Sequence, residues 1–367
     1  MARLGDVFPL IRNGASIKQT DGAGGYPITR IETIANREVD RSKFGYADIE
    51  DVAKYQDYLL QDGDILMSHI NSEKHLGKVA LYHAANEEKI IHGMNLLMLR
   101  ANRNLIRSDY ATYFLNSEAF LRQVPNITKK SVNQASFTVT ALKELTIPVP
   151  ELSEQKEISK NLDKISILIF FRKQQLAKLD ELVKARFVEL FGDYRINNKG
   201  FACKKGSELF KFSSGKFLPE EKRLVSGIPV YGGNGIAWYT DEPLVTFPTI
   251  IVGRVGAQCG NIHAVTTPVW ITDNAIYIKE QKTKAYTLEF LTELMRMMDF
   301  YQYADFSGQP KITQKPLETL EYIMPPIELQ KEYAAFVKQT DKSKMSIQQS
   351  LDKLETLKKS LMQKYFG

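Results

Sequence analysis

The residues that most often carry out enzyme chemistry lie along this sequence without the spacing that such chemistry needs. Neither Gly77-Lys78 nor Gly215-Lys216 has the upstream glycine and the following Ser or Thr of a phosphate-binding loop. Gly253, Gly256 and Gly260 have the wrong spacing for a dinucleotide-binding turn, so we interpret them as turns at a strand end. The histidines and cysteines show no metal-ligand spacing; they are His69, His75, His83, His92, His263, Cys203 and Cys259.

Two further catalytic patterns are incomplete. A DNA amino-methyltransferase holds its flipped base with an Asn or Asp, two prolines and an aromatic residue, whereas Met324-Pro325-Pro326-Ile327 has only the prolines and better suits a helix start. A nuclease needs a metal-binding acid followed by Glu-x-Lys, and Asp273 with Glu280-Gln281-Lys282 fits this loosely. The same pattern occurs at Glu87-Glu88-Lys89 and Glu220-Glu221-Lys222, in a chain with 43 acidic residues. An enzyme with its own active site is therefore the weakest hypothesis.

The composition is that of a globular protein of two or three domains, with 367 residues, 43% of them hydrophobic and 25% charged. Two cysteines cannot form a disulfide scaffold and fit a reducing cytoplasm. The longest apolar run, 167–171, is far shorter than a membrane helix needs. We expect a soluble, cytoplasmic protein with no membrane partner. The net charge of +6 permits nucleic-acid binding without establishing it.

An internal repeat organises the chain. Residues 142–192 align with residues 317–367 at a constant offset of 175, with 14 identities in 51 gapless positions. The identical pairs are Leu142/Leu317, Leu145/Leu320, Pro150/Pro325, Gln155/Gln330, Lys156/Lys331, Glu157/Glu332, Gln174/Gln349, Leu176/Leu351, Lys178/Lys353, Leu179/Leu354, Leu182/Leu357, Lys184/Lys359, Phe191/Phe366 and Gly192/Gly367. The upstream parts match more loosely. The repeat predicts a variable block (1–141), a helical region (142–193), a second variable block (194–316) and a second helical region (317–367).

Both repeated segments have the pattern of a coiled coil. Each follows prolines, and Ser153 is a candidate N-cap of the first helix. Apolar residues then recur at alternating steps of four and three, without Pro or Gly, over 153–190 and 328–365. In the first copy they are Ile158, Leu162, Ile165, Ile169, Leu176, Leu179, Val183 and Leu190, with Arg172 at one position; in the second they are Val337, Leu351, Leu354, Leu357, Leu361 and Tyr365. We expect two helices, each about 57 Å long, that pair antiparallel, the first ending at Gly192.

The variable blocks have a mixed pattern. Short apolar runs bounded by Gly, Asn and Asp predict strands at 64–67, 96–99, 250–252 and 275–278. Longer amphipathic segments predict helices at 110–124 and 286–300. The predicted fold is α+β, with two pseudo-symmetric mixed α/β domains joined by two long antiparallel helices that form a coiled-coil spacer.

One combination of motifs resembles a known family. The run Ser307-Gly308-Gln309-Pro310-Lys311-Ile312-Thr313-Gln314-Lys315 is followed by two leucines, two prolines and Gln330-Lys331 at the start of a long helix. The first copy contains a degraded version at 133–138, and its helix ends in Phe187-Val188-Glu189-Leu190-Phe191-Gly192-Asp193. Over the full length, this order resembles the specificity (S) subunits of type I restriction-modification systems, the HsdS family.

The resemblance implies a function without catalysis in this chain. Such subunits contain two target-recognition domains, each of which recognises one half of a bipartite, asymmetric site in double-stranded DNA. The two helices set the spacing between the halves and bind two modification (methyltransferase) subunits. Restriction (endonuclease) subunits are a further expected partner. The chain itself would need no cofactor, because S-adenosylmethionine belongs on the modification subunit.

Recognition of a duplex combines polar contacts to base edges with contacts to phosphates. The candidate DNA-binding residues of the first block are Arg12, Lys18, Gln19, Arg30, His69, Asn71, Lys74, His75, Lys129, Lys130, Asn133 and Gln134. Those of the second block are Lys211, Lys216, Tyr231, Asn234, Arg254, Gln258, Lys311 and Gln314. Lys311 and Gln309 have a competing role as scaffold or phosphate contacts rather than sequence reading, because they lie at matched positions of the two copies. The alternative function is a helical assembly scaffold whose blocks bind other proteins rather than DNA.

Overall fold

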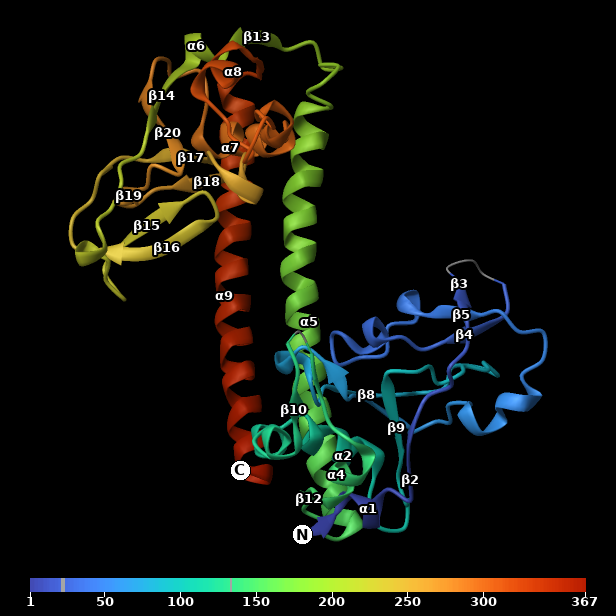
Figure 1. The fold of residues 1–367 in the computed structure, drawn as a ribbon. Helices are drawn as coiled ribbons and strands as arrows, with labels where there is room; N and C mark the ends of the chain where they lie inside the picture. The colour runs from blue at the N-terminus through green and yellow to red at the C-terminus, as the bar shows by residue number, and fades with distance from the viewer. Residues whose placement is uncertain (21–23, 133) are drawn as a thin grey trace. The chain divides into compact units, whose positions relative to one another are not determined.

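The computed structural model describes residues 1–20, 24–132 and 134–367, which form two compact units. Unit 1 comprises Met1–Phe171 and Leu351–Gly367, and unit 2 comprises Arg172–Ser350. The division falls within both long helices, α5 (Leu152–Phe191) and α9 (Ile327–Phe366), so each unit contains part of each helix (Figure 1). Each unit has its own hydrophobic core, to which those helix parts contribute.

Unit 1 is built on small antiparallel sheets. A four-stranded sheet has the order β2 (Leu10–Asn13), β9 (Leu96–Arg100), β6 (Ile65–Ser68), β8 (Val79–Leu81). Two three-stranded sheets have the orders β3 (Gln19–Thr20), β5 (Gly45–Ala47), β4 (Tyr26–Ile28) and β10 (Lys129–Lys130), β11 (Ala135–Ser136), β7 (Ile70–Asn71). A short pair joins β1 (Ala2–Arg3) to β12 (Thr146–Ile147).

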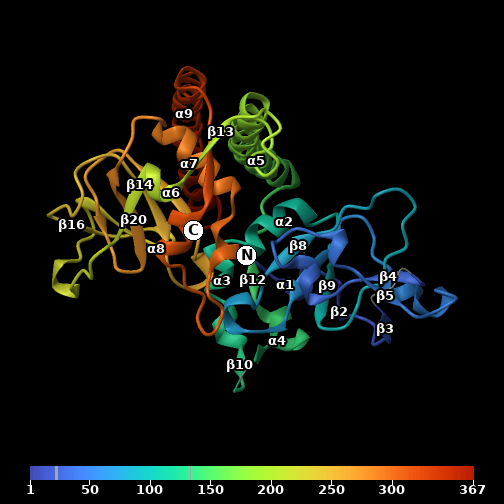
Figure 2. The ribbon, with the colours of Figure 1, turned by 90° about the horizontal axis from the view of Figure 1, so that it is seen from above.

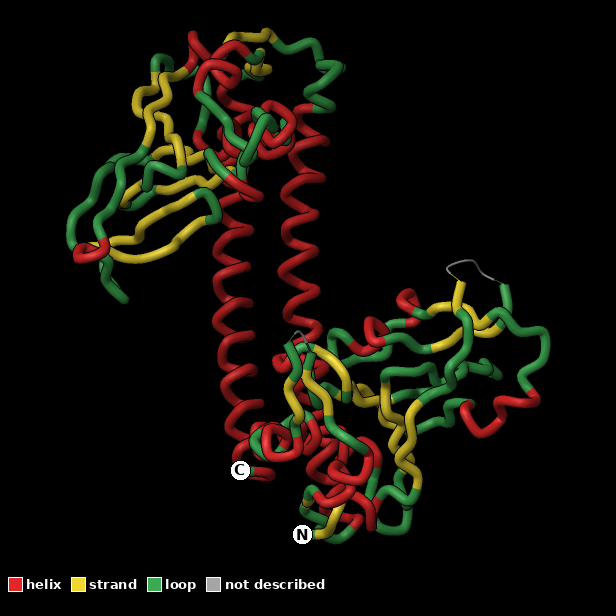
Figure 3. Tube along the Cα trace, viewed as in Figure 1, coloured by secondary structure: helices red, strands yellow, loops and turns green. Residues whose placement is uncertain are grey.

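Unit 2 repeats the central arrangement of unit 1. Its four-stranded sheet has the order β14 (Phe210–Ser214), β20 (Ala275–Gln281), β17 (Thr249–Gly253), β18 (Ile262–Val265). Its short pair is β13 (Ala202–Lys205) with β21 (Glu321–Met324), and its three-stranded sheet is β16 (Gly235–Thr240), β15 (Ile228–Gly232), β19 (Trp270–Ile271). The same order of strands in both units confirms the predicted duplication, and the four predicted strands are present as β6, β9, β17 and β20. Figure 3 shows the strands of both units in yellow.

The shorter helices pack against the strands or against one another. In unit 1 they are α1 (Leu4–Val7), α2 (Ser108–Leu115), α3 (Glu118–Leu121) and α4 (Val139–Glu144), and in unit 2 they are α6 (Gly206–Leu209), α7 (Leu288–Met297) and α8 (Gln314–Thr319). In unit 1, α2 lies beside β8, as the view in Figure 2 also shows.

The single helix predicted at 110–124 is wrong. The segment divides into α2 and α3 because the Ser117 hydroxyl accepts a hydrogen bond from the Phe120 amide at 3.3 Å and starts a new helix. The helix predicted at 286–300 is present as the shorter α7. Thr287 caps its start, and Asp299, at a φ of +45°, lies just beyond its end.

The long helices are present with one more residue at each end than predicted. Because α5 begins at Leu152, Ser153 lies inside the first turn, and the prediction that it caps the helix is wrong. Gly192 follows α5 at a φ of +73°, and its amide donates to the Val188 carbonyl at 2.8 Å. Glycine adopts this left-handed conformation without strain, so it ends the helix as predicted.

The seam of each long helix follows the heptad pattern. Ile158, Leu162, Ile165 and Val183 of α5 are buried, and the predicted seam residues between them are half-buried. In α9, Leu351 is buried, but Leu357 is 47% exposed, so its predicted place in the seam is wrong. The spacing of three and four from Leu354 to Leu361 passes through Lys358 instead, which is half-buried.

The helix parts run antiparallel within each unit. In unit 2, Arg186 pairs with Glu332, and Asp180 pairs with Lys344 at 2.6 Å, so the residue number falls along one helix as it rises along the other. In unit 1, the ring of Phe366 at the end of α9 lies 5.5 Å from that of Tyr110 and 5.8 Å from that of Phe114. Ile158 at the start of α5 belongs to the same core. The predicted antiparallel pairing is confirmed.

Two identical residues of the repeat tie the helices to their units in the same way. The Gln155 side chain is buried; it donates to the carbonyls of Leu105 and Pro150 and accepts from the Arg107 amide, at 2.8–3.0 Å. Gln330 is equally buried and makes the matching bonds to Ala285, Pro325 and Thr287, at 2.8–2.9 Å. This identity between the copies therefore reflects the scaffold.

No helix among the described residues is long and apolar enough to cross a membrane. The described residues also contain no group of three or more His, Cys, Asp or Glu side chains arranged to hold a metal ion.

Candidate nucleic-acid interface

In unit 2, several polar loops meet at one edge of the sheets. Because β14 and β17 both pair antiparallel with β20, their carboxyl ends lie at the edge where β20 begins. We call this set of loops the unit 2 loop edge; it comprises residues 215–217, 231–235, 254–260, 272–274 and 309–311. Backbone hydrogen bonds of 2.8–2.9 Å hold it together, from Lys216 to Ile271, Thr272 to Tyr231, Arg254 to Asn274, Gly256 to Pro310 and Ile312 to Arg254.

Two glycines allow these loops to approach so closely. A Cβ atom on Gly253 would lie 2.4 Å from the Gln258 carbonyl oxygen and 2.8 Å from that of Gly233. A Cβ atom on Gly215 would lie 2.1 Å from the Thr272 carbonyl oxygen. Any side chain at these positions would push the loops apart. The glycine-containing segment that begins at Gly253 forms turns at the end of β17, as predicted.

The unit 2 loop edge brings together six of the eight candidate residues of the second block. They are Lys216, Tyr231, Asn234, Arg254, Gln258 and Lys311. The side chains of Lys216, Asn234 and Arg254 make no hydrogen bond or ion pair within the described part of the chain, and each is half-buried or exposed. Guanidinium, ammonium and amide groups in this state are available to base edges and phosphates.

The other two candidate residues of the second block lie along β14. Lys211 lies opposite Glu280 in the pairing with β20, away from the carboxyl end of β14. Gln314, the first residue of α8, lies against Ser214, the last residue of β14. Gln314 therefore borders the unit 2 loop edge, whereas Lys211 is separate from it.

Unit 1 contains the equivalent edge. The Phe137 amide donates to the His69 carbonyl at 3.2 Å, just as the Ile312 amide donates to the Arg254 carbonyl at 2.8 Å. Both acceptors directly follow the central strand, β6 in unit 1 and β17 in unit 2. His69 and Arg254 therefore occupy matching positions. The degraded first copy of the Gln-Pro-Lys-Ile-Thr motif has kept its place in the fold.

The candidate residues of the first block fall into two groups. Asn71, Lys129, Lys130 and Gln134 lie on or beside the small sheet of β7, β11 and β10, and Lys74 and His75 follow β7 directly. Lys18, Gln19 and Arg30 lie around β3 and β4, where the Arg30 guanidinium donates to the Gln19 side chain at 2.7 Å. Asn133 lies outside the described residues.

Arg12 and His69 are held differently from the rest. The Arg12 guanidinium donates to the Asp57 carbonyl at 3.1 Å and lies 3.9 Å from the centre of the Tyr58 ring. His69 is 7% exposed, and burial lowers its pKa to about 4, so the imidazole is neutral near pH 7. Among the described candidates of both blocks, only His69 is buried.

The sequence analysis missed Arg37 and Lys78. They lie 41 residues apart, yet the Lys78 ammonium donates to the Ala35 carbonyl at 3.0 Å, two residues before Arg37. Arg37 lies in a segment without other candidates, whereas Lys78 follows the candidates Lys74 and His75 by four and three residues. Only the pairing of β6 with β8 brings Lys78 to this place.

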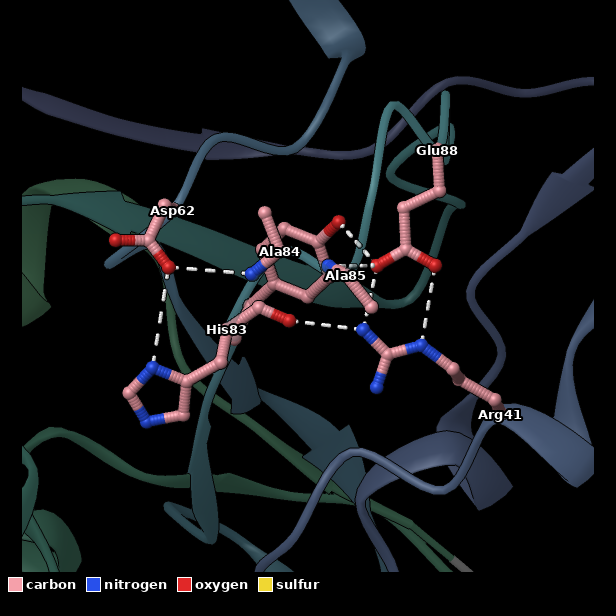
Figure 4. Close-up of polar contacts among 7 residues, drawn as sticks. Arg41, Asp62, His83, Ala84, Ala85 and Glu88 are labelled. Carbon is pink, nitrogen blue, oxygen red and sulfur yellow. Dashed lines mark hydrogen bonds and ion pairs between the residues drawn. The ribbon is translucent and has the colours of Figure 1, made fainter.

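The residues of the nuclease pattern do not form a site. Asp273 lies in the turn before β20 and Glu280 lies near the end of that strand, so a length of strand of roughly 17 Å separates the two residues. Glu88, the middle residue of the pattern Glu87-Glu88-Lys89, accepts from Arg41 at 3.1 Å and from the Ala85 amide at 2.9 Å (Figure 4). The hydrogen bond from Arg41 lowers the pKa of Glu88 to about 2, which suits a fixed structural anion better than an acid-base catalyst.

Comparisons with known proteins identify the family. The family model "Type I restriction modification DNA specificity domain" matches residues 1–181 and 198–357. The chain is 34% identical over 388 residues to a protein of Methanocaldococcus jannaschii described as the type I restriction enzyme MjaX specificity subunit, covering 98% of this chain and 90% of that one. It is 26% identical over 226 residues to the type I restriction enzyme EcoprrI specificity subunit of Escherichia coli, covering 56% of this chain and 55% of that one.

A solved structure shares the fold. The type I restriction-modification S subunit from M. genitalium superimposes with a TM-score of 0.64 at 18% identity, covering 100% of this chain and 95% of that one. The family match spans both variable blocks and most of both helices, and the duplicated sheets and long helices agree with it. The chain therefore belongs to the specificity subunits of type I restriction-modification systems.

Proposed function

We propose that this chain is the non-catalytic DNA reader of a type I restriction-modification enzyme, and that each unit recognises one half of a bipartite, asymmetric duplex site. The observation that carries the proposal is the duplicated loop edge, at the same place on the same sheet in both units. In each copy the edge combines a shared backbone with different side chains, as in the pair His69 and Arg254. A shared scaffold with divergent loops suits two readers of different sequences.

Arg254 is the side chain best placed to read a base in the second half-site. It follows the central strand, lies on the same loop as Gln258 and next to the loop that bears Asn234, and has no side-chain partner among the described residues. Arginine recognises guanine through paired hydrogen bonds to O6 and N7. At the matching position of unit 1, the buried His69 cannot extend in this way. We therefore assign a guanine contact to unit 2 that unit 1 does not share.

In this function α5 and α9 have two roles: they set the gap between the half-sites, and they bind two modification subunits. Ile167, Phe170 and Phe171 of α5 are 52–56% exposed, although they lie on a helix whose opposite face forms the seam. An exposed apolar patch of this kind is typical of a protein-protein contact. The proposal assigns S-adenosylmethionine to the modification subunits and leaves the restriction subunits as further partners.

Selection from a random duplex pool tests the proposal. The chain, assembled with its modification subunits, should enrich duplexes that share two short motifs at one fixed gap. The Arg254→Ala complex should lose the preference for guanine at one position of one motif and keep the other motif. Capture of modification subunits without enrichment of any duplex would favour the alternative, an assembly scaffold that binds only proteins.

A further inference from the structure

A cluster of four basic side chains forms in unit 1 beside its loop edge. Lys74, His75 and Lys78 lie on the loop from β7 to β8, and Arg37 lies on the turn whose Ala35 carbonyl accepts from Lys78 at 3.0 Å. We call Arg37, Lys74, His75 and Lys78 the basic cluster. Arg37 adopts a φ of +63°, a left-handed conformation that costs a non-glycine residue about 1 kcal/mol or more.

The hydrogen-bond partners of the basic cluster are uncharged. The Arg37 guanidinium donates to the Asn116 side-chain oxygen, and Lys78 donates to a backbone carbonyl. Burial is the largest cause of the lowered pKa of Lys78, and the neighbouring charges of Arg37 and Lys74 lower this pKa further. Burial and the charges of Lys78 and Lys74 likewise lower the pKa of His75. The charges of Arg37, Lys74 and Lys78 therefore repel one another, and no ion pair within the described residues compensates them.

The acid of the same loop does not supply a compensating anion. Glu73 lies next to Lys74 in sequence, but its carboxylate pairs with Lys130 of β10 at 2.8 Å. A cluster of like charges in this state gains stability when a polyanion approaches, because each phosphate then offsets a repulsion that already exists in the free protein.

Unit 2 has the same loop without the cations. The Ser68 amide of unit 1 donates to the Lys78 carbonyl at 2.9 Å, and the Gly253 amide of unit 2 donates to the Asn261 carbonyl at 2.8 Å. The Gly77 and Gly260 amides likewise donate back to Ser68 and Gly253, both at 2.8 Å. Asn261 therefore takes the place of Lys78, and its amide group bonds to Gln258.

We propose that the basic cluster clamps backbone phosphates of the duplex next to the first half-site, and that unit 2 has no equivalent clamp. The proposal rests on the proposed function and adds an asymmetry to it: unit 1 supplies much of the salt-sensitive, sequence-independent affinity. Phosphate contacts fix the register of a protein on DNA without reading its sequence. The cluster lies beside Asn71, Lys129 and Lys130, so the clamp flanks the candidate base contacts of unit 1.

The dependence of binding on salt tests the clamp. The dissociation constant of the assembled complex is measured from about 50 to 200 mM salt, with a duplex that bears the selected site and with a scrambled duplex. Each lost phosphate contact reduces the slope of log affinity against log salt by about 0.9. Lys74→Gln and Lys78→Gln should each show this reduction on both duplexes, with the selected motifs unchanged. Lys160→Gln, which removes the same charge from the exposed face of α5, should keep the wild-type slope.

Lys78→Arg separates charge from packing, since it keeps the cation and should restore the wild-type slope. Wild-type slopes in both glutamine variants would overturn the clamp and leave the proposed function intact. A changed motif in these variants would also overturn it, because the residues would then read bases. If the wild-type complex bound neither duplex, the proposed function itself would fail.

Discussion

At the scale of single residues, Gln155 shows how the repeat is held together. Its buried amide satisfies three backbone groups of unit 1, and no other side chain has the same set of donors and acceptor at that length. Replacing Gln155 with Met leaves those groups unpaired and should lower the free energy of unfolding by about 2–4 kcal/mol. Gln174→Met, on the exposed face of the same helix, should change it by less than about 0.5 kcal/mol. Urea denaturation of both variants checks the difference, and equal stabilities would contradict it.

Two buried histidines make unit 1 sensitive to acid. Burial lowers the pKa of His69 to about 4 and that of His92 to about 3, below the ordinary value of 6.5. The folded state therefore keeps both imidazoles neutral, while the unfolded chain takes up protons below about pH 6.5. Their stabilising contribution is complete above pH 6.5 and is lost as the pH falls toward the folded values. Between pH 7 and pH 5 we expect a loss of up to about 2 kcal/mol for each histidine.

Denaturation of the wild type and of His92→Leu across this range measures the effect. The variant lacks one of the two groups, so its stability should fall less steeply between pH 7 and pH 5. The same steepness in both proteins would show that His92 does not contribute.

The types of the candidate interface residues could be predicted from sequence, but their partners could not. Arg254 and Lys216 stood out as polar residues in Gly-rich loops, and the fold brings them to one edge. Arg37 and Lys78 meet only through strand pairing between distant segments, which no local pattern encodes. The burial of His69 likewise depends on its packing beside Phe137, at 6.3 Å between the rings.

At the scale of elements, two leucines of α9 that are both identical in the two copies of the repeat differ in burial, because only one of them lies in the heptad seam. Leu351 is 5% exposed and Leu357 is 47% exposed, although both match leucines of the first copy. Leu351→Ala should lower the free energy of unfolding by about 2–4 kcal/mol, because it leaves a cavity in the seam. Leu357→Ala should cost less than about 1 kcal/mol. Thermal denaturation of the two variants measures the difference. Similar losses of stability in both variants would contradict the assignment of Leu351 alone to the seam.

Long periodic helices were predictable because a heptad pattern over forty residues is a strong signal, and the glycine after α5 marks its end. The break between α2 and α3 was not, since Ser117 also fits within an amphipathic helix until its side chain is seen to cap. The place of Lys358 in the seam was not predictable either, because an apolar residue was expected at that position. The aliphatic part of the lysine side chain is half-buried there instead.

At the scale of the whole molecule, the repeat predicted the duplicated sheets, because two copies of one scaffold must bury the same positions. The divergent loops carry no such constraint, and their sequences alone do not give the bases that they contact.

The proposed spacing role of the helices predicts a measurable change in the DNA site. One heptad inserted after Phe171 in α5 and one after Ser350 in α9 preserves both seams and adds roughly 10 Å, at 1.5 Å per residue. The half-site sequences should stay the same while the gap grows by about three base pairs, at 3.4 Å each. Insertions of four residues instead rotate the seams and should weaken pairing. Sequencing of methylated adenines gives the gap, and an unchanged gap with full activity would show that the helices do not set it.

The most direct test of the central claim, that each unit reads its own half-site, is to exchange residues 1–141 for the corresponding block of another specificity subunit. The chimaeric chain is expressed with the modification subunits, and methylated adenines are located by sequencing. The account predicts that one half of the methylated motif changes to that of the donor while the other half stays the same. A motif in which both halves change, or neither does, would contradict it.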